Sequence, residues 1–310
     1  MFKSTPTASL LAPSGKPARL TVGVRGLLVT VICGIYGYQI TRPIDLPGLR
    51  IEPRTGDYQL AKQWARDLDA YQLTAILKGP SISDDLIFNL EAVLSFVEHL
   101  DVLISSPVKL AEADPFAQFL PSITTHRRNS GGGAIIGEDT FFHSSRSIFI
   151  SKALNRLQDK TFCEQTQFNI LFFKCVETFR QRKPFIEVTY FLLYSGLESY
   201  ARSVVNQRST RNSSSVPIGE LLAGYGFDVQ IERPRDLQRA VSTYTHLRNA
   251  LFHNSEFTAT VNVNGTVVEL KLFDYLFNIS QLVALVVLKA VDFDDGHINW
   301  NSWIDRQPFK

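Results

Sequence analysis

The hydrophobic pattern of this chain changes character once, at about residue 148. Before that point, runs rich in β-branched residues alternate with amphipathic stretches, and beyond it the apolar residues recur mainly at helical spacing. The first pattern is typical of a small mixed α/β domain and the second of a helical bundle. We therefore predict an α+β protein with a flexible N-terminus at 1–20, a mixed α/β domain at 21–150 and an all-α bundle at 151–310 that carries one inserted β-hairpin.

The first half combines strand and helix signals. We expect strands within 20–37 and at 49–52, 71–77 and 102–104, and helices at 58–68 and 83–99. Ser83 has the composition of an N-cap, because Asp84 and Asp85 follow it. This half contains no nucleophile elbow, dinucleotide fingerprint or acid pair. An enzyme acting on small molecules is therefore the weakest hypothesis for it, and we assign it a sensing or regulatory role.

The second half reads as helices interrupted by one hairpin. We expect helices at 162–180, at 185–205, from Pro217 to about Gly224 or Gly226, from Pro234 to about His253, and at 273–291. Proline is favoured at the first helical position, which places two of these starts. Two β-rich runs, 258–263 and 266–272, flank Asn264-Gly265. That pair favours the tight turn of a β-hairpin.

Composition excludes several classes of protein. With 45% hydrophobic residues and a net charge of +2 in 310 residues, the chain is globular and has no bulk charge that commits it to a nucleic acid or a membrane surface. Cys33, Cys163 and Cys175 are odd in number and widely spaced, which fits a reducing cytoplasm. The apolar run 279–291 contains Gln281 and Lys289, so we expect a core helix and no membrane anchor.

One short motif carries candidate chemistry. On a helix beginning at Pro234, the residues Leu237, Val241, Tyr244 and Leu251 form the apolar stripe, and Arg248 lies inside it. An unpaired buried guanidinium is costly, so Arg248 must pair with an acid, face a cleft or meet a partner chain. We expect Glu198, or another acid on the 185–205 helix, to be that acid.

Two further polar residues accompany Arg248. Asn249 and His253 are four apart and share one edge of the helix. A cation, an amide and an imidazole around one concavity could bind a phosphate and move protons near neutral pH. A plainer interpretation stays open, in which His253 is a partner of the helix dipole and Arg248 a structural ion pair.

No metal or cofactor is expected. The three cysteines form no ligand set. Acids and a histidine concentrate only after the last helix, where we expect a solvated segment: Asp292, Asp294, Asp295 and His297.

The motif resembles that of the HEPN superfamily (higher eukaryotes and prokaryotes nucleotide-binding domains). The stretch from Leu247 to Asn254 matches its Arg-polar-x-x-x-His pattern without a gap, on the third long helix of a helical bundle. Residues 194–198, Tyr-Ser-Gly-Leu-Glu, resemble the acid-bearing helix of abortive-infection HEPN proteins. The resemblance covers roughly 155–295, and the two-part architecture is similar to that of ApeA-type anti-phage proteins.

The resemblance implies a metal-independent endoribonuclease acting in phage defence or as a toxin. A ribose 2′-hydroxyl would attack the adjacent phosphate, with His253 as general base or acid, Arg248 stabilising the phosphorane and Asn249 orienting the phosphate or the histidine. Glu198 would support Arg248. HEPN nucleases generally pair two such sets, which implies a homodimer or a higher even oligomer.

Charge patterning adds candidate RNA contacts. Between residues 180 and 248 there are ten Lys or Arg against six Asp or Glu. The basic residues that we expect to contact RNA are Arg202, Arg208, Arg235 and Arg239. A phage trigger or regulatory partner would act on the N-terminal domain. The alternative function is a HEPN fold without catalysis, which binds nucleotide or RNA or serves assembly.

Overall fold

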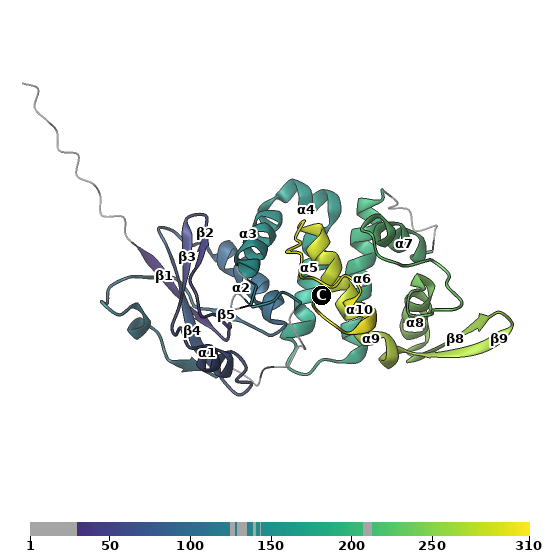
Figure 1. Cartoon of the computed structure of the whole chain (residues 1–310), viewed down its shortest axis with the longest axis horizontal. Coiled ribbons are helices and arrows are strands. Elements are labelled where there is room, and N and C mark those ends of the chain that lie inside the picture. Colours follow the sequence, from purple (N-terminus) through teal and green to yellow (C-terminus); the bar gives the residue numbers. More distant parts are fainter. Residues whose placement is uncertain (1–29, 125–127, 129–134, 139–140, 143, 207–212) are drawn as a thin grey trace, which may run out of the picture.

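The structure is a computed structural model that describes residues 30–124, 128, 135–138, 141–142, 144–206 and 213–310. An N-terminal antiparallel sheet lies at one end, helices fill the middle, and a β-hairpin projects at the other end (Figure 1). The predicted α+β class is confirmed. The N-terminus predicted to be flexible, 1–20, lies outside the described residues.

The sheet is built around two strands that are buried along nearly their whole length. β1 (Val31–Tyr36) pairs with β4 (Tyr71–Gly79), and the strand order is β2-β3-β4-β1-β5. The flanking strands are β2 (Ile44–Leu46), β3 (Leu49–Pro53), β5 (Leu103–Ile104), β6 (Val108–Lys109) beside β1, and β7 (Ser122–Ile123) beside β4. Both strands are rich in apolar residues, which reflects this two-sided burial.

Both helices predicted in the first half are present. α1 (Tyr58–Ala65) packs on β4, and α2 (Asp84–Glu98) begins after Ser83, whose Oγ accepts a hydrogen bond from the N–H of Leu86 at 3.2 Å. The short 3₁₀ helix η1 (Pro115–Gln118) follows β6. α2 ends where His99 adopts a left-handed conformation, with φ of 50°.

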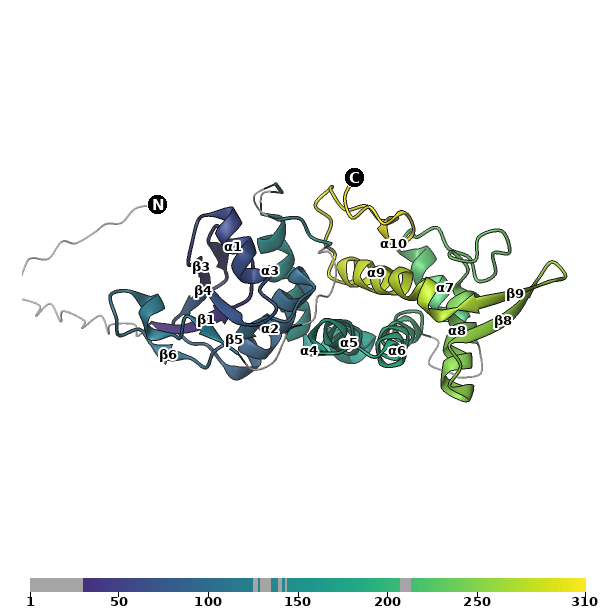
Figure 2. The same cartoon turned by 90° about the horizontal axis from the view of Figure 1, so that it is seen from below.

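α2 and α3 (Ser145–Gln158) join the two halves of the molecule. Both helices lie between the sheet and the helices that follow (Figures 1 and 2). The ring of Phe96 in α2 packs against those of Phe149 in α3 and Phe172 in α5, with 5.3 Å and 5.6 Å between the ring centroids. The boundary predicted at residue 150 therefore falls within α3, and one continuous apolar core runs through both halves.

The C-terminal half is helical, with one hairpin. Its elements are α4 (Lys160–Thr166), α5 (Phe168–Arg180), α6 (Ile186–Val204), α7 (Ser215–Gly224), α8 (Val241–Asn254), β8 (Thr258–Val263), β9 (Thr266–Lys271), α9 (Leu272–Ala290) and α10 (Ser302–Asp305). The hairpin is confirmed. Asn264 and Gly265 have φ of 51° and 85°, as the turn between twisted strands requires.

The predicted helices that differ most from the structure are those at 162–180 and from Pro234, whereas α7 begins two residues before Pro217 and α1 ends three residues before 68. The helix expected at 162–180 is divided in two, because Gln167 is left-handed and its N–H caps α4 at the carbonyl of Cys163. The helix expected from Pro234 begins only at Val241. The N–H groups of Val241 and Ser242 donate to the carbonyls of Gln230 and Ile231, so the preceding segment is held as a loop against the start of α8.

α9 is a long apolar helix of the core. By length and composition alone it is a candidate membrane span, and 56% of its apolar window is buried inside the protein. It packs against α5 and α6, and Asn278 Nδ2 donates to the carbonyl of Trp303 at 2.7 Å. Burial of this kind is what the core helix of a soluble protein also shows, so α9 is weak evidence for a membrane.

Buried charges gather where the sheet meets the helices. Glu98 is fully buried, and its Oε1 lies 2.9 Å from Arg146 Nη1 while its Oε2 lies 3.4 Å from Arg66 Nη2. Nearby, both terminal nitrogens of Arg128 donate to backbone carbonyls, those of Ala65, Asp67, Gly37 and Asp101. Buried charges are tolerated only when paired or hydrogen-bonded in this way.

His99 gives the fold a specific sensitivity to acid. His99 is buried and stacks on Phe179, with 4.3 Å between the ring centroids. Its burial and, to a smaller extent, the positive charge of Arg66 lower its pKa from 6.5 to about 3. Between those values the unfolded chain binds a proton that the folded chain does not. The free energy of unfolding should therefore fall by up to about 1.4 kcal/mol per pH unit as the pH drops below 6.5.

Replacing His99 by Asn, which tolerates the left-handed conformation, should remove this contribution. Urea unfolding of both proteins at pH 7, 6 and 5 measures it. The expected result is a shallower loss of stability in His99→Asn, and equal slopes would contradict the assignment.

Candidate functional site

The motif lies on α8, which packs outside α6 on the side away from the sheet (Figure 1). Val241, Tyr244 and Leu251 are buried, as predicted, and Leu247 is fully buried with them. Leu237 packs on the same core but lies before the helix. Arg248 is partly buried, with 31% of its side chain exposed.

Glu198 pairs with Arg248, as predicted. Its Oε2 lies 3.9 Å from Arg248 Nη2, and its Oε1 accepts from Arg202 Nε at 2.9 Å and from Ser214 Oγ at 2.6 Å. The carboxylate is therefore shared by two guanidinium groups, and it holds Arg202 more closely than Arg248. The longer distance leaves Arg248 able to bind a second anion.

The other contacts of Arg248 fix its direction. Its Nη1 donates to Asn249 Oδ1 at 3.0 Å, and its Cζ lies 5.9 Å from the ring of Tyr194 and 5.3 Å from that of Phe252. Burial raises the pKa of Tyr194 to about 12, so its hydroxyl, hydrogen-bonded to Thr245 Oγ1 at 2.8 Å, stays protonated. The aromatic faces and Glu198 keep the guanidinium at the α6–α8 junction.

Asn249 and His253 are exposed and lie along one edge of α8. Helical geometry places His253 about 140° around the axis from Arg248. Two hollows flank α8, and neither is lined by Arg248, Asn249 or His253. Neither of these two hollows of the single chain therefore provides the concavity expected from the sequence around the three side chains.

The predicted RNA-contacting arginines differ in their surroundings. Arg202 is held by Glu198, and Arg239 is paired with Asp228 at 3.2 Å and Asp236 at 3.1 Å. Arg235 is exposed and forms no ion pair with the described residues. Arg208 lies outside the described residues. Of the four, Arg235 is the one whose described surroundings leave it open to a phosphate.

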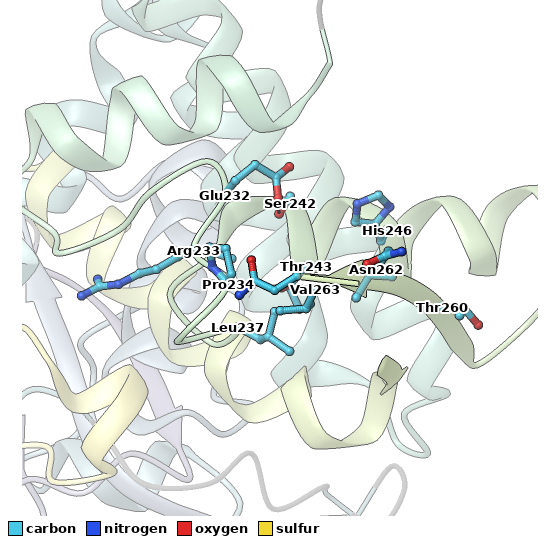
Figure 3. Close-up of a pocket in the computed structure, with 13 residues that line it drawn as sticks. Glu232, Arg233, Pro234, Leu237, Ser242, Thr243, His246, Thr260, Asn262 and Val263 are labelled. Atoms are coloured by element: carbon cyan, nitrogen blue, oxygen red, sulfur yellow. Dashed lines mark hydrogen bonds between the residues drawn. The ribbon is translucent and has the colours of Figure 1, made fainter. Parts of the chain in front are cut away.

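Sequence reasoning missed a polar stripe on the same helix. Ser242 and His246 precede Asn249 and His253 at the spacing i, i+4, i+7, i+11, which puts all four on one face of α8. Ser242 and His246 line a pocket of about 340 Å³ between α8, β8 and the loop before α8 (Figure 3). The sequence shows the helical spacing of these four residues, but it does not show that β8 and the loop before α8 form the opposite wall of the pocket.

The second hollow is apolar and borders the motif. It has a volume of about 410 Å³ and is lined by Glu187, Val188, Phe191, Leu251, Phe252, Ser255 and Phe257. The rings of Phe191 and Phe252 pack together with 4.9 Å between their centroids, and the two residues are 40% and 41% exposed. Aromatic groups left open to water beside a polar site are typical of a protein interface.

No metal centre is evident in the part of the chain that the structure describes, since no three His, Cys, Asp or Glu residues are grouped closely enough to hold an ion. The C-terminal acids are used locally: Asp294 accepts from the N–H of Gly296 and from Trp300 Nε1, and Asp295 from the N–H of His297. All three cysteines are buried, and burial raises the pKa of Cys33 and of Cys175 to about 12.

Comparison with known proteins found no match to this chain among family models, curated proteins or solved structures.

Proposed function

We propose that this chain is a metal-independent endoribonuclease of the HEPN type that acts in the cytoplasm in phage defence or as a toxin. One observation carries the proposal: α8 holds Arg248 against Glu198 while it presents Asn249 and His253 along its exposed edge. A fixed cation, an amide that contacts it and an accessible imidazole on the same helix are groups that phosphoryl transfer from RNA can use.

The proposed reaction needs no cofactor. A base removes the proton of a ribose 2′-hydroxyl, and the oxygen attacks the adjacent phosphorus. The bond from phosphorus to the 5′-oxygen breaks as an acid protonates that oxygen, leaving a 2′,3′-cyclic phosphate and a 5′-hydroxyl. His253 fills the role of base or acid, Arg248 stabilises the charge on the phosphorane, and Asn249 orients the phosphate.

A cleavage assay tests the proposal. The full chain is incubated with a mixed-sequence oligoribonucleotide in excess EDTA, and the product ends are mapped. We expect fragments with cyclic phosphate and 5′-hydroxyl ends, and no cleavage of the 2′-deoxy oligonucleotide. Absence of cleavage, or cleavage that EDTA abolishes, would contradict the proposal.

We further propose that two chains complete the site. One His253 supplies one titratable group, whereas cleavage requires both a base and an acid. The motif lies on an open surface beside the apolar hollow formed by α6 and the end of α8. A two-fold axis through that surface would cover the aromatic groups and bring two His253 and two Arg248 to one cleft.

Charges placed in the apolar hollow should separate the dimer. Val188→Glu and Phe257→Glu alter side chains that are 41% and 49% exposed, so the fold should persist while association and cleavage are lost. Leu120→Glu changes a 66% exposed apolar side chain in the N-terminal half and serves as the control. Light scattering measures the mass, and a wild-type monomer that cuts RNA at full rate would contradict the composite site.

A second candidate function is favoured by the open geometry of the motif. Because Arg248, Asn249 and His253 line neither hollow of one chain, a non-catalytic module that binds RNA or serves assembly is consistent with the same residues. This function predicts RNA binding without cleavage. The N-terminal half would in either case act as sensor or regulator, since it shares one core with the helices.

A further inference from the structure

A polar pocket lies beside the motif, on the hairpin side of α8. Its walls come from three segments: the loop before α8 with Glu232 and Leu237, the start of α8 with Ser242 and His246, and β8 with Asn262 (Figure 3). Its volume of about 340 Å³ suits a ligand of nucleoside size. We refer to it as the α8–β8 pocket.

The polar groups of this pocket are placed by hydrogen bonds. Ser242 Oγ donates to Glu232 Oε2 at 3.0 Å, which fixes the carboxylate at the wall. Asn262 Oδ1 accepts from the N–H of Gly265 at 2.8 Å, so the amide is oriented by the hairpin turn and its Nδ2 is left as a donor. The pocket thus offers a carboxylate acceptor, an amide donor and the exposed imidazole of His246.

Several ion pairs and hydrogen bonds hold the wall formed by the loop. Asp228 accepts from Arg233 Nη1 at 2.8 Å and pairs with Arg239 at 3.2 Å, and Arg239 also pairs with Asp236. The first N–H groups of α8 are bonded to the carbonyls of the same loop. A pocket held by this many contacts is formed before a ligand arrives, which lowers the entropy cost of binding.

One residue of the pocket wall, His246, lies on the same face of α8 as the proposed catalytic residues. His246, Asn249 and His253 lie along one face of α8, and the helical rise separates the first from the last by about 10 Å. A phosphate bound at Asn249 and His253 would therefore place a neighbouring nucleotide at the mouth of the α8–β8 pocket.

We propose that the α8–β8 pocket is a ribonucleoside subsite, which binds the ribose and base of a nucleotide next to the scissile phosphate. As a subsite it rests on the proposed nuclease function. Glu232 accepts hydrogen bonds from ribose hydroxyls or a base N–H, Asn262 donates to a base carbonyl or ring nitrogen, and Leu237 packs against the base. The 2′-hydroxyl gives such a site its preference for RNA over DNA.

Binding of free nucleotides tests the pocket without cleavage. The probes are the four ribonucleoside 3′-monophosphates and their 2′-deoxy analogues, titrated by calorimetry into the full chain. We expect at least one ribonucleotide to bind, with affinity at least fivefold weaker in Glu232→Gln and in Asn262→Asp, which keeps the acceptor for Gly265 and removes the amide donors. Glu164→Gln, an exposed carboxylate on α4, is the matched control and should bind as the wild type.

The same variants distinguish this proposal from the nuclease function. His253→Ala should lose the chemical step of RNA cleavage, whereas Glu232→Gln and Asn262→Asp should raise KM or change the preferred base while kcat is retained. If the wild type binds the nucleotide but does not cleave RNA, the nucleotide site is supported and the nuclease function is contradicted. Cleavage combined with no ribonucleotide binding, or with binding that neither pocket variant weakens, would overturn the subsite.

Discussion

Replacing Arg248 or His253 by alanine is expected to abolish RNA cleavage while leaving folding and assembly intact. Loss of a proton-transfer group costs about 10²–10⁴-fold in rate, and loss of a group that stabilises developing charge about 10²–10³-fold. Neither side chain belongs to the core, since Arg248 is partly exposed and His253 is exposed. The rate constant for cleavage of one oligoribonucleotide measures the effect, with circular dichroism and light scattering to establish fold and mass.

His297→Ala is the matched control, because His297 is also an exposed histidine but lies after the last core helix. Its cleavage rate should equal that of the wild type. If the site is composite, mixing wild type with an excess of Arg248→Ala chains should produce partly inactive heterodimers and a rate below that of the same wild-type concentration alone. A His253→Ala protein that still cuts RNA would contradict the catalytic assignment.

The largest effect on stability is expected at Glu98. This carboxylate is fully buried and joins Arg146, itself only 3% exposed, to Arg66 and to the backbone N–H of Gln39. Glu98→Gln keeps the shape of the side chain but removes the carboxylate charge that pairs with Arg146 and Arg66. Removing one partner of a buried ion pair costs about 3–5 kcal/mol. Urea unfolding at pH 7 measures the change.

A surface ion pair provides the comparison. Asp45 lies 2.6 Å from Arg50, but both side chains are largely exposed, at 72% and 46%. Asp45→Asn should therefore change the free energy of unfolding by less than about 1 kcal/mol. A loss of stability in Glu98→Gln no larger than that in Asp45→Asn would show that the buried cluster is not what joins the sheet to the helices.

The sequence was most informative where a structure depends on residues close together in the chain. The hairpin follows from Asn264-Gly265 between β-rich runs, the start of α2 from Ser83 and the acids after it, and the extents of α6 and α9 from long apolar stripes. The pairing of Arg248 with Glu198 was predictable too, because helical geometry set the guanidinium on an apolar face where it required an acid.

Other features depended on contacts between distant segments. The proline at 234 begins no helix, since hydrogen bonds from the start of α8 to residues 230 and 231 hold the loop open. The single core that spans both halves arises because Phe96 meets Phe149 and Phe172. The α8–β8 pocket exists only where Glu232, Ser242 and Asn262 converge. Local propensities differ by less than about 1 kcal/mol per residue, so tertiary hydrogen bonds and burial of larger magnitude decide such features.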